Sequence, residues 1–195
     1  YHFKNKCSTI ISNDLEYYSY VLLKEYVKRK EKIFFDYSIL NNLDTIEGFI
    51  TEEYAVKRKY FTIDNAKKID SIMTFLKTID DENIFFHLLT LLLEAANKVA
   101  NTASVYRAFL KKYKKSSLKE LIIKNNNIEL SVNDNFVYNE DANTLIKKIN
   151  GDILYLDPPY NHRQYGSNYH LINTIAKMET FSPKGITGLP SYNTS

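Results

Sequence analysis

Hydrophobic and polar positions alternate in different ways along the first hundred residues. Residues 8–12 form a short β-branched run that ends in polar residues, which predicts a strand followed by a loop. From 15 to 31, apolar and aromatic residues recur at helical spacing among charged ones, so we expect a helix there. Residues 34–100 are rich in Lys, Glu, Leu and Ile without alternation, which indicates several helices. Their most apolar part, 84–100, predicts the most buried of these helices.

The pattern changes after residue 119. Short strands are predicted at 122–123, 128–132 and 136–138, with a turn at 132–135. Residues 141–149 have helical spacing, and Asn150-Gly151 supplies a helix stop. Residues 152–156 are a nearly continuous apolar run, as expected for a strand buried on both faces of a parallel sheet. Ligands of such α/β units bind at the carboxyl ends of the strands, so the next residues are candidates for chemistry.

The segment Asp157-Pro158-Pro159-Tyr160 ends the apolar run and carries the strongest chemical signal. Its two prolines lack backbone donors and stiffen the turn, which leaves neighbouring carbonyls free to accept hydrogen bonds. Asp157 adds a carboxylate acceptor, and Tyr160 adds a flat aromatic face. The amino group of a nucleobase needs acceptors for its hydrogens and a ring on which the base stacks. A tight turn after a strand, where Asp-Pro is common, is the alternative interpretation.

Basic residues cluster in one part of the chain, although the net charge of +3 alone is too small to indicate a nucleic-acid partner. Every charged residue between 107 and 119 is basic: Arg107, Lys111, Lys112, Lys114, Lys115 and Lys119. With Phe109 and Tyr113 among them, they suit a DNA backbone and a displaced base. A solvated helix face is the alternative. Arg163 and Gln164, just after the proline turn, are further candidates for contact with the target strand.

Composition excludes several other classes of protein. The single cysteine, Cys7, rules out an internal disulfide framework and fits a reducing cytoplasm, where we expect the protein to reside. The longest apolar stretch contains charged residues, so we expect a buried helix and no membrane span. His162 and His170 have no partner cysteines or carboxylate cluster, so we assign no metal. We interpret His87 as a packed core residue.

These motifs together resemble the Dam-like class of DNA adenine methyltransferases, which modify the exocyclic amino group, and particularly its restriction-modification members. The proline motif alone is shared with other amino methyltransferases, whereas its combination with three other segments is more specific. Those segments are residues 11–16, 99–106 and 161–171. The likeness covers most of the chain and keeps the family's motif order.

The resemblance implies an α/β fold: part of a Rossmann-like methyltransferase sheet, interrupted by a mainly helical insertion. Residues 1–33 and 130–195 would belong to the catalytic domain, and residues 34–129 would be the insertion that recognises the DNA target. The methyl donor would be S-adenosylmethionine, the substrate double-stranded DNA, and a further partner a cognate restriction endonuclease.

The resemblance also gives roles to the residues of the proline motif. A DNA adenine would be flipped from the duplex, and Tyr160 would stack on it. Asp157 and the carbonyls of Pro158 and Pro159 would hold the amino group for a direct displacement without a covalent enzyme intermediate. Asp157 would also border the cofactor.

Two other carboxylates match cofactor-binding positions of the family. Asp14, at the end of a predicted strand, would bind the ribose hydroxyls, because a carboxylate accepts two hydrogen bonds from a diol. Asp141, which follows the apolar run 136–138, would contact the adenine of the cofactor. Each of them could instead cap the helix that follows it.

The chain departs from the family pattern at both ends. The glycine-rich cofactor loop should precede residue 10, whereas the first glycine is Gly48, and further strands should follow the last residue. We therefore expect a fragment that is inactive by itself. The alternatives are a catalytically inactive DNA-binding remnant and an amino methyltransferase that acts on RNA or on protein glutamine.

Overall fold

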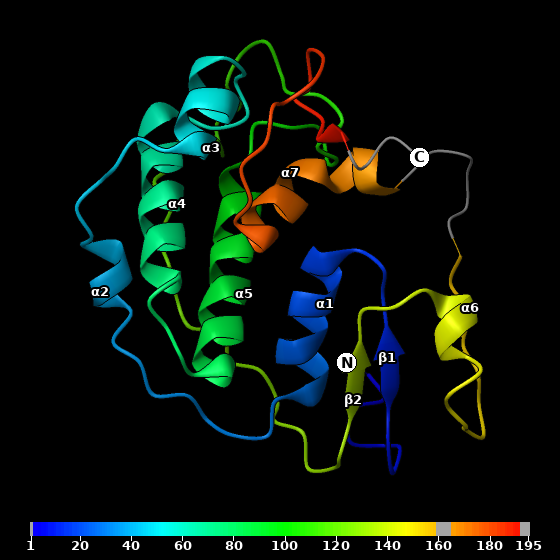
Figure 1. The fold of residues 1–195 in the computed structure, drawn as a ribbon. Helices are drawn as coiled ribbons and strands as arrows, with labels where there is room; N and C mark the ends of the chain where they lie inside the picture. Colours follow the sequence, from blue (N-terminus) through cyan, green and yellow to red (C-terminus); the bar gives the residue numbers. More distant parts are fainter. Residues whose placement is uncertain (1, 159–164, 192–195) are drawn as a thin grey trace.

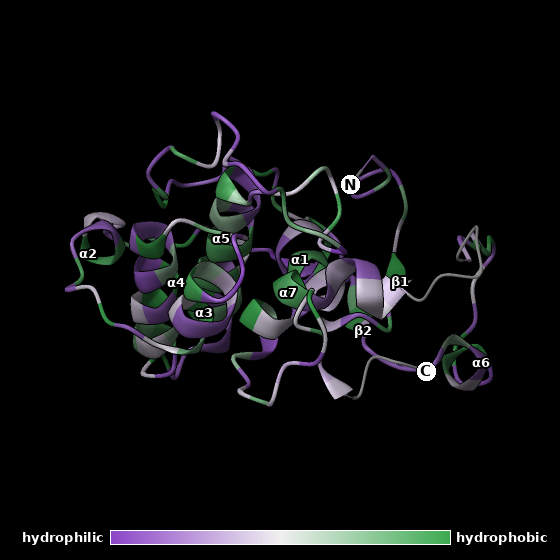
Figure 2. Ribbon diagram, turned by 90° about the horizontal axis from the view of Figure 1, so that it is seen from above, coloured by the Kyte–Doolittle hydropathy of each residue, from purple (hydrophilic) through white to green (hydrophobic). Residues whose placement is uncertain are grey.

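A short parallel sheet lies between helices in this computed structural model, which describes residues 2–158 and 165–191 (Figure 1). Strand β1 (Ile11–Asn13) pairs in parallel with β2 (Phe136–Tyr138), with Ile11 opposite Phe136 and Asn13 opposite Tyr138. The strand predicted at 136–138 is confirmed, and β1 falls at the end of the strand predicted at 8–12. Figures 1 and 2 place α1 on one side of the sheet and α6 on the other.

The helix predicted at 15–31 is confirmed with narrower bounds. It runs as α1 (Tyr17–Leu23) and continues as the π-helix η1 (Lys24–Lys28). The other helices are α2 (Ser38–Asn41), α3 (Phe49–Thr51), η2 (Glu52–Val56), α4 (Ile63–Leu76), α5 (Glu82–Val99), α6 (Ala142–Leu145) and α7 (Tyr165–Lys177). The helices predicted within 34–100 are therefore present. Of the helix predicted at 141–149, only α6 forms.

Helix α5 forms the centre of the core, as its apolar sequence predicts. It packs against α1, α4 and α7 and contributes more buried residues than any other described helix. Its green colouring in Figure 2 reflects this apolar composition. The side chain of Asp81 caps its first turn by accepting a hydrogen bond from the Ile84 amide at 2.9 Å. In the described part of the chain, no helix is both long and apolar enough to cross a bilayer.

His87 is a core residue, as interpreted from the sequence. It is fully buried on α5, where its Nδ1 lies 2.9 Å from Glu25 Oε1 and its Nε2 lies 2.9 Å from the Tyr37 hydroxyl. Arg29 also contacts the Glu25 carboxylate, at 3.2 Å. The Glu25 carboxylate is almost fully buried, and such a charge needs partners of this kind. These contacts fix η1 against α5.

The strands predicted at 122–123 and 128–132 are wrong. This region has no strand, because amide side chains take up its backbone hydrogen bonds where a strand would use a neighbouring strand. Leu121 donates its backbone amide to Asn65 Oδ1 at 2.8 Å, and Ile123 donates to Asn41 Oδ1 at 2.9 Å. The β-branched and apolar residues here therefore anchor a surface segment to the helical core.

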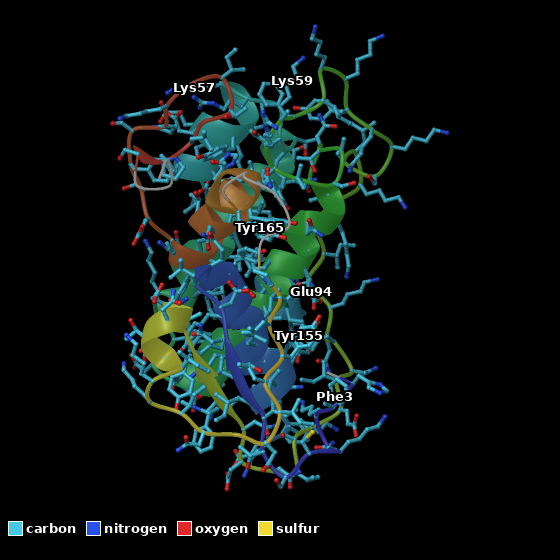
Figure 3. The ribbon with its side chains drawn as sticks, turned by 90° about the vertical axis from the view of Figure 1, so that its right-hand side faces the viewer. Phe3, Lys57, Lys59, Glu94, Tyr155 and Tyr165 are labelled. Carbon is cyan, nitrogen blue, oxygen red and sulfur yellow. The ribbon has the colours of Figure 1, made fainter. Side chains whose placement is uncertain are left out.

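The buried strand predicted at 152–156 is also wrong. These residues are irregular and exposed; Ile153 is 90% and Tyr155 82% accessible. Figure 3 shows the segment as an extended trace with Tyr155 on the surface. An apolar run is buried as a strand only where a neighbouring strand binds its backbone and helices cover its faces. Among the described residues, β1 and β2 are the strands, and they pair with each other.

Candidate active site and DNA-contacting surface

Both parallel strands end at the same edge of the sheet, and hydrogen bonds join the two loops that follow them. Asn13 Nδ2 donates to the Glu140 carbonyl at 2.9 Å, and the Glu140 amide donates to Asn13 Oδ1 at 3.0 Å. Asn139 Nδ2 donates to the carbonyls of Asp14 and Leu15, at 2.7 and 3.0 Å. This pairing was not predicted from the sequence. It brings Asp14 and Asp141 to one edge, where ligands of parallel sheets bind.

Asp14 lies between β1 and α1 and is half-buried. Its Oδ1 accepts a hydrogen bond from the Glu16 amide at 2.9 Å, and its Oδ2 accepts one from the Ser19 hydroxyl at 2.6 Å. The carboxylate thus braces the start of α1. The N-cap of this helix is Glu16, so the interpretation of Asp14 as the N-cap is wrong. A carboxylate has about four lone-pair sites, so these two bonds leave capacity for the two hydroxyls of a ribose.

Asp141 is exposed and caps the short helix α6. Its Oδ1 accepts hydrogen bonds from the amide and the hydroxyl of Thr144, at 3.1 and 3.4 Å. The capping interpretation therefore describes Asp141 correctly. A role toward a cofactor stays a prediction for both Asp14 and Asp141.

The described part of the proline motif, Asp157 and Pro158, ends the exposed segment 152–158. Asp157 and Pro158 are exposed, whereas Pro159, Tyr160, Arg163 and Gln164 lie outside the described residues, as does His162. Roles in catalysis and DNA contact therefore stay predictions for all of these residues. The structure does show what positions the chain after the motif, because α7 packs directly on α1.

Polar and aromatic contacts fix α7 to α1. The Tyr18 amide donates to Asn173 Oδ1 at 2.9 Å, and Asn173 Nδ2 donates to the Glu16 carboxylate. Burial raises the pKa of Glu16. The rings of Tyr18 and Tyr169 lie 5.3 Å apart, centroid to centroid. Helix α7 is therefore anchored next to the loop that holds Asp14.

The basic segment 107–119 consists of turns and irregular backbone and contains no helix, so the interpretation as a solvated helix face is wrong. Arg107, Lys111, Lys112 and Lys115 are exposed, and Lys114 is half-buried with its Nζ donating to the Thr102 carbonyl at 2.8 Å. Within the described ranges, none of the five forms an ion pair with a carboxylate. The charges of the four exposed residues therefore face solvent without a carboxylate partner.

Asn101 holds this segment against the helical core. It is fully buried, and its Nδ2 donates to the carbonyls of Lys59 and Leu110, at 2.9 and 3.0 Å. Its Oδ1 accepts from the amide of Lys114 at 3.1 Å and from the hydroxyl of Ser117 at 3.4 Å. The amide of Asn101 thus joins two points of the basic segment to the helical core.

The hydrogen bonds of Asn101 bring Lys59 close to the basic segment. The sequence did not predict this neighbour, because Lys59 lies far from residues 107–119 along the chain. Lys59 is exposed, and its carbonyl accepts the Asn101 bond. Figure 3 labels Lys59 at the end of the molecule that carries the green loops of this region. The neighbouring Lys57 instead pairs with Glu52 and Glu53. We call Lys59, Arg107, Lys111, Lys112, Lys114 and Lys115 the basic surface.

His170 and Cys7 offer no metal-binding chemistry in this arrangement. Both ring nitrogens of His170 face backbone carbonyls, Nδ1 that of Ser167 at 3.1 Å and Nε2 that of Thr187 at 3.0 Å. Burial lowers the pKa of His170. Cys7 is an exposed free thiol. In residues 2–158 and 165–191, no three His, Cys, Asp or Glu side chains gather as metal ligands would.

Comparison with known proteins relates the whole chain to one family. A family model described as D12 class N6 adenine-specific DNA methyltransferase matches residues 1–195. The type II methyltransferase M.NlaIII of Neisseria lactamica is 47% identical over 205 residues, which cover 99% of this chain and 61% of that protein. The type II methyltransferases M.CviAII of Paramecium bursaria Chlorella virus 1 and M.FokI of Planomicrobium okeanokoites are 40% and 38% identical.

The chain spans 59% of M.CviAII and 32% of M.FokI, while these matches cover 95% and 94% of the chain itself. No solved structure matches it significantly. The family model covers every residue, including the proline motif, both strands and the basic segment. The chain therefore belongs to the D12 class of N6 adenine-specific DNA methyltransferases.

Proposed function

We propose that this chain is part of an enzyme that transfers a methyl group from S-adenosylmethionine to the exocyclic amino group of adenine in double-stranded DNA. The family match over all 195 residues is the observation that carries the proposal. Several relatives bear the names of type II methyltransferases, which supports a place in a restriction-modification system and a cognate endonuclease as partner.

The cofactor would lie at the carboxyl edge of β1 and β2, as part of a Rossmann-like sheet. The fit rests on Asp14, which lies at this edge and keeps lone-pair capacity for a diol. Asp141 lies after the neighbouring strand, within reach of the same edge, and keeps its other carboxylate oxygen for a donor. When bound, S-adenosylmethionine supplies an activated methyl group on a sulfonium.

The proline motif would hold the base. The carboxylate of Asp157 and the carbonyls of Pro158 and Pro159 would accept hydrogen bonds from the adenine amino group, and Tyr160 would stack on the base. A negative charge fixed beside the amino nitrogen stabilises the positive charge that develops there as the nitrogen is methylated. Residues 1–33 and 130–195 form the catalytic part in this proposal, and residues 34–129 recognise the target.

A DNA-binding remnant is the second candidate function. The exposure of Asp157 and Pro158 favours it, since catalysis needs a base pocket that excludes water. The test is methyl transfer from labelled S-adenosylmethionine to unmethylated mixed-sequence DNA, with RNA and a glutamine-containing protein as alternative acceptors. Label on adenine of DNA supports the enzyme. DNA binding without label on any acceptor, by the complete natural protein, supports the remnant.

The basic surface should contact DNA phosphates. Replacing Lys111 and Lys112 together by alanine is expected to weaken binding of mixed-sequence duplexes by about tenfold at moderate salt. The slope of log affinity against log salt should become shallower by about 0.9 for each phosphate that the protein no longer neutralises. Fluorescence anisotropy over a range of salt concentrations measures both quantities.

Lys77→Ala is the matched control for this experiment. Lys77 is an exposed lysine just after the last residue of α4, whereas Lys59 lies before its first residue. The 14 residues of α4 span about 21 Å, so the two lysines lie well apart. Replacement of Lys77 should change neither the affinity nor the salt slope. Equal effects of the two changes would mean that the basic surface contributes net charge only and no particular DNA contact.

A further inference from the structure

A tight turn near the end of the chain presents an isoleucine to solvent. Lys184 and Leu189 exchange two backbone hydrogen bonds, at 2.8 and 2.9 Å, and so close the turn. Gly185 and Gly188 have φ values of 68° and 76°, which favour glycine. Ile186 lies between them and is 84% exposed. We call residues 184–189 the isoleucine turn.

Side chains of the helical core bind the backbone of this turn. The Arg58 guanidinium donates to the carbonyls of Gly185 and Ile186, both at 3.1 Å. The Tyr54 hydroxyl donates to the Gly188 carbonyl at 2.6 Å. A Cβ on Gly188 would lie 2.9 Å from both Arg58 Nε and Tyr54 Cε1, so the packing there is tight. Single exposed apolar side chains are common, but the backbone under Ile186 is held by three side-chain hydrogen bonds from Arg58 and Tyr54.

The isoleucine turn adjoins both parts of the proposed DNA-binding face. The Tyr60 hydroxyl lies 2.8 Å from the Tyr106 carbonyl, next to Arg107, and 3.2 Å from the Thr187 carbonyl in the turn. The turn also contacts the first half of α7, the helix that follows the proline motif, through His170.

We propose that Ile186 inserts into the DNA duplex when the protein binds, at the position from which a base has been displaced. The inference rests on the proposed function, because base displacement is needed only if the amino group of a paired adenine reacts. Apolar wedges are known to enter between base steps. A wedge on a turn that is already fixed loses little conformational freedom on insertion, and nearby positive charge attracts the phosphates. The clamp from Arg58, Tyr54 and Tyr60 provides the rigidity, and the basic surface provides the charge.

Binding to duplexes with an abasic site tests this insertion without requiring catalysis. A wedge gains affinity where a base is missing, because no base has to be unstacked. The wild-type protein is expected to bind an abasic duplex about tenfold more tightly than the intact duplex. Ile186→Ala should remove most of this preference. Gly188→Ala, which displaces the turn but keeps the isoleucine, should weaken it as well.

Val132→Ala is the control, since Val132 is also an exposed apolar residue (72%) and binds Asn5 in another region. If Ile186→Ala keeps the wild-type preference, or Val132→Ala loses it equally, the insertion proposal is wrong. The proposed function is judged separately, by methyl transfer. If the protein prefers the abasic duplex through Ile186 but does not methylate DNA, the enzymatic function is refuted and the insertion of Ile186 is supported. If it methylates DNA but shows no preference for the abasic duplex, the insertion is refuted and the enzymatic function is supported.

Discussion

Replacing Asp157 by alanine is expected to abolish methyl transfer while DNA binding stays close to that of the wild-type protein. In the proposed mechanism this carboxylate accepts a hydrogen bond from the adenine amino group and stabilises the charge that develops on its nitrogen. Removing one such group from an active site lowers kcat by about 100- to 1,000-fold. Asp157 is exposed, so the loss should not come from unfolding. Initial rates with labelled S-adenosylmethionine and anisotropy with duplex DNA measure the two effects.

Asp152→Ala is the matched control for this change. Asp152 is an exposed aspartate on the same segment, five positions before Asp157, and no role is assigned to it. It should keep wild-type activity, which would show that the segment tolerates loss of a negative charge. The proposed mechanism is refuted if Asp157→Ala methylates DNA at the wild-type rate. It is also refuted if both substitutions lower the rate equally.

The sequence predicted the family and the helical core of this protein better than its strands. The proline motif, the core position of His87 and the strand at 136–138 could be found from local patterns. The prediction of a buried strand at 152–156 was wrong, because an apolar run is buried as a strand only beside another strand and under covering helices. The residues of the run do not specify these neighbours. The prediction of a strand at 122–123 was wrong for a similar reason. The backbone of this segment is bound by Asn41, a residue from another part of the chain, and no strand lies beside it among the described residues.

The parts of the site that could not be predicted arise from contacts between distant residues. The backbone of Lys59 is linked to the basic segment by Asn101, which lies 42 positions away. The isoleucine turn becomes rigid through Arg58, 128 positions from Ile186. Asn101 and Arg58 belong to no periodic pattern and no motif, so their contacts with distant residues could not be predicted from the sequence. For Asp14 the sequence left two roles open. It is not the N-cap of α1, and cofactor binding stays a prediction, for which its two hydrogen bonds leave lone-pair capacity.

The second large effect is expected from Asn101→Ala, which should reduce both stability and DNA affinity. The substitution removes the partners of the Lys59 and Leu110 carbonyls and of the Lys114 amide in a fully buried position. Each buried polar group left without a partner costs about 1–3 kcal/mol, so the free energy of unfolding should fall by about 3 kcal/mol or more. The basic segment should also lose its fixed shape. Urea unfolding and duplex binding measure the two consequences.

Two further variants separate these consequences. Asn143→Ala changes an exposed asparagine on α6 and should alter the free energy of unfolding by less than about 0.5 kcal/mol. Asn101→Asp keeps the acceptor but turns a carboxylate toward two carbonyls, so it should destabilise at least as much as alanine. Wild-type stability of Asn101→Ala would contradict the anchoring role. Wild-type stability with lost DNA affinity would instead mean that Asn101 contacts DNA itself, and the basic segment would have to open to expose it.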